Sequence, residues 1–159
     1  MQNLQALLKL LIHSPVDFVL VGGFAAVLHG SNQITRDIDI CVLYSAEQVE
    51  QLRNILRPFH PRHHTEEPST SFLEFPKDLS TEQDFHLATD LGLLDIITRI
   101  EGVGDYYDIL EGSEEIELYG GRCRITGIDD LIKSKRRLGR HRDLAVVEEL
   151  EAVLKEKGK

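Results

Sequence analysis

The 159-residue chain has no tryptophan, only one methionine and only two cysteines. Cys41 and Cys123 have no partner nearby in the sequence, which excludes a disulfide framework and a thiolate metal site. We therefore expect two buried free thiols in a reducing compartment.

No apolar run approaches the roughly 20 residues of a membrane span. The amphipathic start is interrupted by Lys9 and lacks a small-residue cleavage site, which argues against a secretory signal. The sequence predicts a cytoplasmic protein.

Positive charge is scarce, with 18 Lys and Arg against 27 Asp and Glu, for a net charge of −9. A chain this acidic repels nucleic acid unless its positive charge is localised. Six basic residues do gather within ten positions: Lys133, Lys135, Arg136, Arg137, Arg140 and Arg142. They indicate either a solvated helix face or a site for nucleotide phosphates or another anion.

The length and composition are those of one soluble domain spanning residues 1–159, with a core at about 16–126 and C-terminal helices at about 128–156. Apolar periodicity and turn signals predict helices at 3–13, 23–29, 46–57, 128–137 and 142–156. Strands are expected at 17–21, 36–43, 85–89, 93–99, 115–119 and 122–126, with hairpins at 90–92 and 120–121. Residues 58–84 show no clear periodicity. This order predicts an α+β (mixed α/β) fold.

A glycine pair, Gly22-Gly23, follows the short apolar strand and precedes the helix 23–29. Without a Cβ, these residues let backbone N–H groups approach a ligand closely. The N–H groups at a helix start have no partner within the helix and favour phosphate. An ordinary strand-to-helix turn is the alternative explanation of the pair.

Acidic residues interrupt two of the apolar strands. Asp37 and Asp39 lie two residues apart on strand 36–43, so both carboxylates point to one face while Ile38 and Ile40 point to the other. Asp95 stands in a similar apolar setting on strand 93–99. Carboxylates are rarely buried unpaired, so we expect them to coordinate metal ions or, alternatively, to pair with Arg36 and Arg99.

The order of these elements resembles the signature of the DNA polymerase β-like nucleotidyltransferases. The resemblance lies in Gly22-Gly23, in Asp37-Ile38-Asp39, and in Asp95 as a third carboxylate. The stretch Lys133-Ser134-Lys135 … Gly139-Arg140-His141-Arg142-Asp143-Leu144 is similar to the tail of small bacterial and archaeal members, with Arg142 where those often have lysine. The resemblance covers about residues 16–150. It implies a mixed sheet with helices mainly on one face, which leaves the acidic face open to ligand.

The resemblance also implies an activity, the transfer of an NMP from an NTP to an acceptor hydroxyl with release of pyrophosphate, and ATP is the expected NTP. Asp37, Asp39 and Asp95 are then the catalytic ligands of two Mg²⁺ ions, and Gly22 and Gly23 receive phosphates. Further candidate phosphate contacts are Arg36, Lys133, Lys135 and Arg140. The acceptor stays open among a small molecule, a protein hydroxyl and an RNA end, and a partner protein or homodimer is possible.

Two further alternatives concern function and the histidines. Small members of this family also include halves of toxin–antitoxin pairs, so a non-catalytic nucleotide-binding or partner-binding protein is the alternative function. His60, His63 and His64 lack a fourth zinc ligand nearby, so an exposed surface loop is the expected setting, with substrate contact as the alternative.

Overall fold

The computed structural model describes residues 3–158, and the predicted domain 1–159 extends beyond this range at residues 1–2 and 159. The helices are α1 (Leu4–Ile12), α2 (Gly22–His29), α3 (Ala46–Leu56), α4 (Tyr106–Glu111), α5 (Ile128–Leu138) and α6 (His141–Lys157), with a 3₁₀ turn at Arg57–Phe59. The strands are β1 (Phe18–Val21), β2 (Asp37–Val42), β3 (Arg62–His63), β4 (Phe85–Thr89), β5 (Gly92–Ile97), β6 (Arg99–Ile100), β7 (Gly104–Asp105), β8 (Glu114–Leu118) and β9 (Gly121–Ile125).

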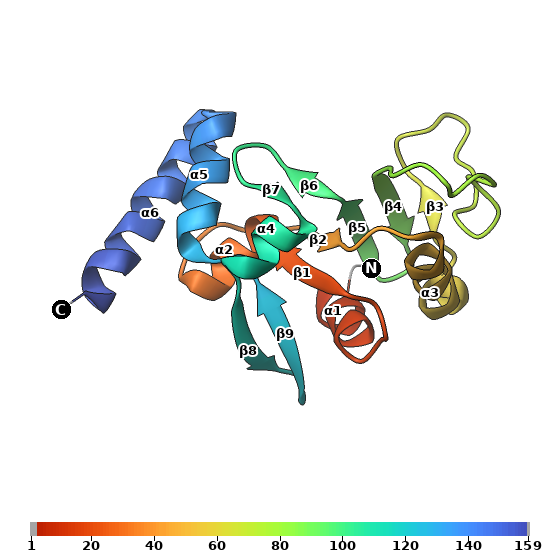
Figure 1. Ribbon diagram of the computed structural model, residues 1–159, viewed down its shortest axis with the longest axis horizontal. Helices are drawn as coiled ribbons and strands as arrows, with labels where there is room; N and C mark the ends of the chain where they lie inside the picture. Colours follow the sequence, from red (N-terminus) through yellow and green to blue (C-terminus); the bar gives the residue numbers. More distant parts are fainter. Residues whose placement is uncertain (1–2, 159) are drawn as a thin grey trace.

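Seven strands form one mixed sheet in the order β3-β4-β5-β2-β1-β9-β8 (Figure 1). Strand β2 lies near the middle, antiparallel to β1 and parallel to β5. Strands β6 and β7 form a separate small hairpin. The prediction of an α+β fold built on a mixed sheet is therefore confirmed.

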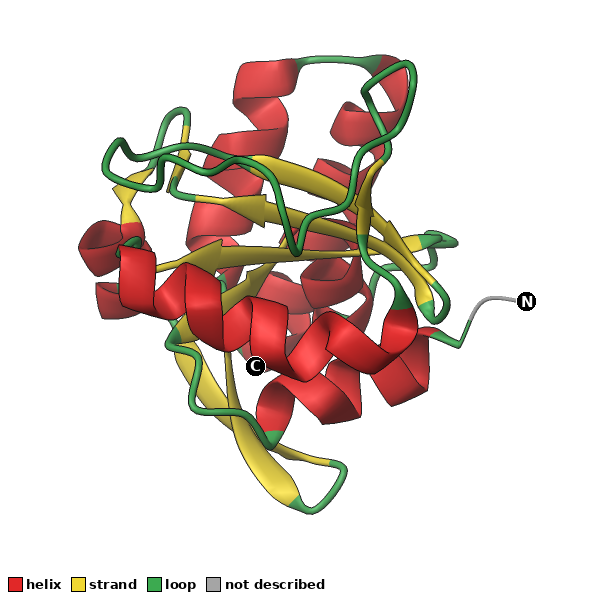
Figure 2. Cartoon of the chain, turned by 90° about the vertical axis from the view of Figure 1, so that its right-hand side faces the viewer, coloured by secondary structure: helices red, strands yellow, loops and turns green. Residues whose placement is uncertain are grey.

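The main hydrophobic core lies on one face of the sheet. Ile38 and Ile40 of β2 and Leu94 and Ile96 of β5 are fully buried there, together with apolar residues of α1, α2, α3, α5 and α6. Figure 2 shows these helices in red against the yellow strands. Because side chains alternate along a strand, the residues between these positions point to the opposite face, where the acidic residues lie.

The opposite face carries a smaller apolar cluster. Val19, Val21 and Cys41 pack there against Tyr106 and Ile109 of α4. This cluster covers only part of the face. The α4 helix and the β6–β7 hairpin therefore act as a partial wall beside the acidic residues rather than as a full second layer.

Most predicted elements are confirmed to within two residues, but three features differ. The predicted strand 93–99 ends at Ile97, and Arg99 begins β6 in the separate hairpin. The hairpin and α4 were not predicted. The connection 58–84 contains the short edge strand β3, which pairs with β4.

The prediction of exposed histidines is wrong for His63. His63 is buried, its Nε2 lies 2.7 Å from the Phe75 carbonyl oxygen, and its ring packs against Phe72. His60 is exposed, as expected, and lies beside Asp90.

Both cysteines are buried free thiols, as predicted. Within residues 3–158, no helix combines the length and apolar character that a membrane crossing requires.

Candidate functional site

Three aspartates meet on the partly open face of the sheet. Asp37 and Asp39 project from β2, and Asp95 projects from β5 directly opposite Asp39 in the parallel register. One carboxylate oxygen from each residue lies within 4.8 Å of the others. The structure therefore brings together the three acids that the sequence predicted as a set.

The electrostatics of this cluster favour a bound cation. Burial raises the pKa of Asp39 to about 8, with further contributions from the negative charges of Asp37 and Asp95. Burial also raises the pKa of Asp37, and the charge of Asp95 adds to this rise. A carboxylate that is hard to ionise beside two others gains most from a positive charge placed between them.

The alternative explanation, that Arg36 and Arg99 pair with these acids, is not supported among the described residues. Arg36 lies just before β2 but forms no ion pair with the three carboxylates, and Arg99 lies in the β6–β7 hairpin, where it pairs in register with Asp105. Lys135 does act on Asp39 through its charge, because it opposes the rise in the pKa of Asp39.

His86, which the sequence did not predict as a site residue, lies beside the cluster of three aspartates. His86 on β4 lies opposite Asp95 on β5, and the His86 Nδ1 and Asp95 Oδ1 atoms are 2.9 Å apart. The predicted hairpin at 90–92 would set residue 87 beside residue 95, whereas the observed strands close one residue earlier, with Thr89 opposite Gly92, and this register sets His86 beside Asp95. The exposed His64 side chain opposes, through its charge, the rise in the pKa of Asp37.

The glycine pair lies against the same acids. Gly22 has φ +70°, and a Cβ there would stand 2.1 Å from Oδ2 of Asp39. A side chain at this position would therefore push the carboxylate away, besides straining the backbone. Gly22 and Gly23 open α2, so their N–H groups lie at the helix end that favours anions.

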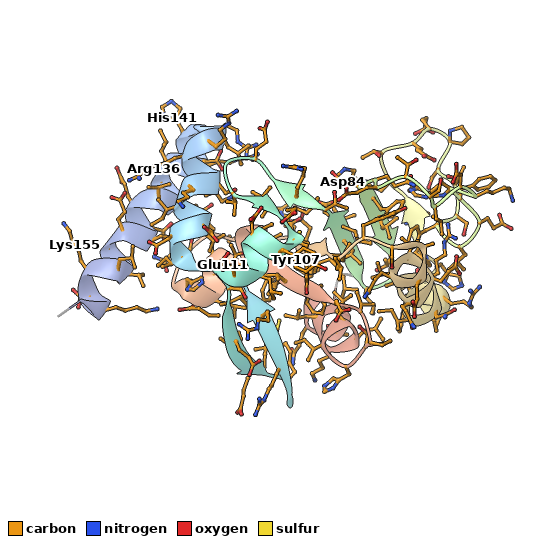
Figure 3. All side chains as sticks on the ribbon, in the orientation of Figure 1. Asp84, Tyr107, Glu111, Arg136, His141 and Lys155 are labelled. Carbon is orange, nitrogen blue, oxygen red and sulfur yellow. The ribbon has the colours of Figure 1, made fainter. Side chains whose placement is uncertain are left out.

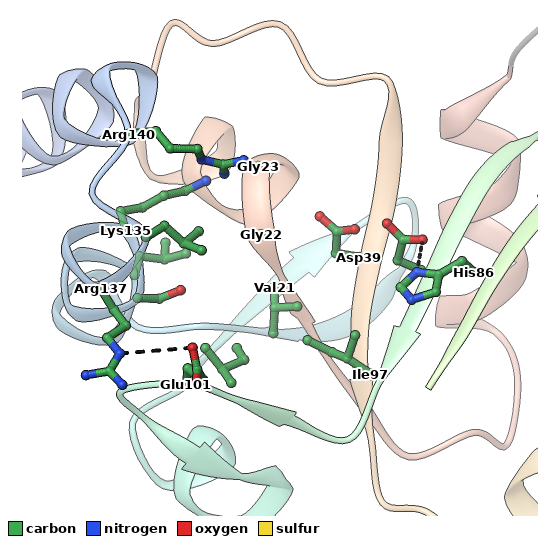
Figure 4. A pocket seen from close by; sticks show the side chains of 15 residues that line it. Val21, Gly22, Gly23, Asp39, His86, Ile97, Glu101, Lys135, Arg137 and Arg140 are labelled. Carbon is green, nitrogen blue, oxygen red and sulfur yellow. Dashed lines mark hydrogen bonds and ion pairs between the residues drawn. The ribbon is translucent and has the colours of Figure 1, made fainter. Parts of the chain in front are cut away.

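A first hollow of about 320 Å³ lies beyond Asp39 on this face (Figure 4). Its walls are the apolar side chains of Val21, Ile97, Ile100, Leu131 and Leu138, and we call it the apolar hollow. Asp39, Asp95 and His86 also line it. At the rim, the Arg137 Nε atom lies 4.0 Å from Glu101 Oε2, which joins α5 to the β6–β7 hairpin.

A second hollow of about 410 Å³ lies at the beginning of β2. Arg36, Lys135, Arg140 and Arg142 line it together with Asp37 and Asp39, and we call it the basic hollow. Gly23, Asp39, Lys135 and Arg140 line both hollows. The acidic cluster therefore stands where an apolar space and a basic space meet.

Lys135 and Arg140 are held in place by a buried acid. The Asp143 side chain is 1% exposed, and its carboxylate lies 2.5 Å from Arg140 Nε and 3.6 Å from Lys135 Nζ. Figure 4 shows both basic side chains extending toward Gly23. Hydrogen bonds from Arg140 lower the pKa of Asp143, so this acid stays ionised and keeps the two cations oriented.

The remaining members of the basic cluster have different surroundings. Lys133 is 65% exposed, pairs with Asp130 at 4.0 Å, and lines neither hollow. Arg136, labelled on α5 in Figure 3, forms an ion pair with Glu151 of α6. The structure thus separates the predicted phosphate contacts: Arg36, Lys135 and Arg140 lie beside the acids, and Lys133 does not.

Two solved structures resemble this chain over nearly its whole length. One is a proposed nucleotidyltransferase from Thermotoga maritima, with a TM-score of 0.55 and 20% identity over 98% of this chain and 92% of that chain. The other is the lincosamide antibiotic adenylyltransferase LnuA bound to lincomycin, with a TM-score of 0.58 and 18% identity over 94% of this chain and 95% of that chain. No family model and no curated protein matches the sequence. At this level of identity the likeness concerns architecture, and the chain has the fold of a small nucleotidyltransferase.

Proposed function

We propose that this protein transfers a nucleoside monophosphate from an NTP to an acceptor hydroxyl and releases pyrophosphate. The observation that carries the proposal is the cluster of Asp37, Asp39 and Asp95, whose carboxylate oxygens lie within 4.8 Å of one another beside the Gly22 turn. The likeness to two structures named as nucleotidyltransferases supports the same general reaction.

The acidic cluster suits divalent cations such as Mg²⁺. Carboxylate oxygens are the ligands that Mg²⁺ prefers, and the pKa of Asp39 is raised first by burial and then by the negative charges of its neighbours, both of which a bound cation would offset. Asp37 and Asp39 would hold two ions, with Asp95 as a further ligand. Bound ions of this kind neutralise the charge that develops on the phosphate oxygens.

The protein's own residues would bind and orient the nucleotide. The N–H groups of Gly22 and Gly23 offer hydrogen bonds to phosphate oxygens, and Lys135 and Arg140, which line both hollows together with Gly23, add positive charge. One of the neighbouring structures is an adenylyltransferase, which favours ATP as the donor. A cytoplasmic location is consistent with such a donor.

Asp95 is the residue best placed to accept the proton of the acceptor hydroxyl. It lines the apolar hollow, and His86 contacts one of its oxygens at 2.9 Å. That contact limits the rotation of the carboxylate. We therefore assign Asp95 the role of catalytic base and metal ligand, and His86 the role of positioning it.

The proposal is tested by incubating the protein with each of four α-³²P-labelled NTPs, MgCl₂ and either a metabolite extract or total RNA. We expect labelled product together with an equal amount of pyrophosphate, most strongly with ATP. Asp95→Asn should reduce the transfer rate at least about 100-fold, as expected when a group that assists proton transfer is removed. Asp129→Asn, which changes an exposed acid of α5, is the matched control and should retain activity.

Two outcomes would contradict the proposal. If Asp37→Asn and Asp39→Asn both retain full transfer activity, the carboxylates are not the catalytic centre. If calorimetry finds that ATP binds equally well with Mg²⁺ and with EDTA, and no labelled product forms with any NTP, the protein binds nucleotide without catalysis.

A further inference from the structure

The two hollows lie on opposite sides of Asp39 along the strands. Strands β2 and β5 run parallel, with Asp39 opposite Asp95 and Cys41 opposite Ile97. The basic hollow is lined by Arg36 and Asp37 at the beginning of β2. The apolar hollow is lined by Ile97 at the end of β5 and continues to Ile100 of β6.

This placement matters because the bond that forms and the bond that breaks are in line. In nucleotidyl transfer, the acceptor oxygen attacks the α-phosphorus from the side opposite the departing pyrophosphate. The basic hollow, with four cationic side chains, suits the pyrophosphate group. If the pyrophosphate leaves on that side, the attacking hydroxyl approaches from the apolar hollow.

We infer that the apolar hollow is the acceptor site and that the acceptor is a small organic alcohol with an apolar body. This inference rests on the proposed function and adds the class of acceptor to it. The acceptor oxygen would bond to the α-phosphorus while the bond from that phosphorus to the bridging oxygen breaks. Asp95 would take the hydroxyl proton, and pyrophosphate would leave with the electron pair.

The size and the walls of the hollow set this class of acceptor. A volume of about 320 Å³ lies near the lower end of the range of roughly 300–1,000 Å³ that is usual for small-molecule sites. Val21, Ile97 and Leu131 would contact carbon rather than polar atoms. Such walls favour an aliphatic or aromatic body, and Asp95, which also lines the hollow, would orient the hydroxyl.

The charges around the apolar hollow argue against a nucleic-acid acceptor. An RNA strand gains its affinity from unpaired Lys and Arg side chains that contact phosphates. Arg137 contacts Glu101, and Lys135 and Arg140 also line the basic hollow, where the pyrophosphate group would occupy them. The net charge of −9 works in the same direction.

The inference is tested by NMR of the methyl groups of Ile97 and Leu138, with 2-phenylethanol as the probe. We expect 2-phenylethanol to shift these signals, both alone and with Mg²⁺ and α,β-methylene-ATP bound, while glycerol does not shift them. Leu138→Gln should weaken binding of 2-phenylethanol about fivefold, the change expected when one apolar wall contact of about 1 kcal/mol is lost. Leu138 is 52% exposed, so this substitution leaves the core intact.

Leu144→Gln is the matched control, because Leu144 is 44% exposed on α6 and does not line the hollow. It should leave binding of 2-phenylethanol unchanged. Displacement of 2-phenylethanol by α,β-methylene-ATP would overturn the inference, because the nucleobase would then occupy the hollow. Shifts with a short oligoribonucleotide but not with 2-phenylethanol would also overturn it and favour an RNA acceptor.

The test separates this inference from the proposed function. If α,β-methylene-ATP binds in a Mg²⁺-dependent manner and 2-phenylethanol does not bind, only the acceptor class is wrong. If 2-phenylethanol binds but α,β-methylene-ATP does not bind with Mg²⁺, the nucleotidyltransferase function is wrong, and the acceptor role fails with it.

Discussion

The strand register decides which single residues lie together in this site. The sequence shows Asp37, Asp39 and Asp95 as acids in apolar strands, and the resemblance to a known arrangement predicted them as one set. His86 could not be found from composition, since a histidine on a strand has no local signature. Its role depends on its position opposite Asp95 across the β4–β5 hairpin.

Lys133 and Lys135 show why the basic cluster could be predicted only in part. They lie two residues apart in sequence, and on a helix with 3.6 residues per turn this separation turns their side chains about 200° apart. The Lys135 side chain is 17% exposed and lines both hollows, while the Lys133 side chain is 65% exposed. Counting charges along the sequence cannot make this distinction.

We predict that Lys135→Gln weakens binding of α,β-methylene-ATP in the presence of Mg²⁺ about tenfold, whereas Lys133→Gln changes this binding less than twofold. The physical reason is that a partly buried cation beside the phosphate site is screened less by water than an exposed one. Isothermal titration calorimetry of both variants against the unmodified protein measures the difference. Equal losses in the two variants would mean that the cluster acts only through its overall charge.

At the scale of elements, sequence patterns found the long helices and the paired strands. The β6–β7 hairpin and α4 escaped because strands of two residues and a helix of six residues are too short to show periodicity. Both nevertheless shape the site, since Ile100 of β6 lines the apolar hollow and Ile109 of α4 packs with Val21.

The junction between β7 and α4 depends on Gly104. Gly104 has φ +135°, and a Cβ there would stand 2.1 Å from Oδ2 of Asp108. Asp108 in turn accepts a hydrogen bond from the N–H of Asp105, and Asp105 accepts one from the N–H of Asp108, which forms the capping box that begins α4.

We predict that Gly104→Ala lowers the free energy of unfolding by about 2–3 kcal/mol, because it adds backbone strain and displaces a cap. Gly120→Ala is the matched control: its φ is +76°, but no atom lies within 4 Å of the added Cβ. Its loss should be about 1 kcal/mol from strain alone. Urea denaturation followed by circular dichroism measures both, and equal losses would contradict a role for the cap.

At the scale of the whole molecule, folding brings together charges that are far apart in the sequence. Asp37 and Asp39 come from the first quarter of the chain, Asp95 from its middle, and Lys135 from its C-terminal part. No local pattern reveals that one face of the sheet joins them; the sequence could suggest it only through resemblance to a known arrangement. The pKa of Asp39 is raised by its burial and, after that, by the two neighbouring carboxylates.

That raised pKa makes the stability of the metal-free protein depend on pH. Asp39 ionises near its ordinary pKa of 3.8 when unfolded and at about 8 when folded. The folded state therefore holds a proton that the unfolded state has lost between these values. Stability from this group is fully present below about pH 4, falls as the pH rises toward about 8, and levels off above it.

We predict that in EDTA at pH 8.5 Asp39→Asn melts at least about 3 °C above the unmodified protein, the shift that roughly 1 kcal/mol causes in a domain of this size. At pH 4 the two should melt within about 1 °C of each other, because the unmodified Asp39 is then protonated in the folded state. Adding Mg²⁺ at pH 8.5 should raise the melting temperature of the unmodified protein and of Asp129→Asn, but not that of Asp39→Asn, which has lost a metal ligand. A difference between Asp39→Asn and the unmodified protein that stays constant with pH would mean that Asp39 acts through packing. A response of Asp39→Asn to Mg²⁺ equal to that of the unmodified protein would place the metal elsewhere.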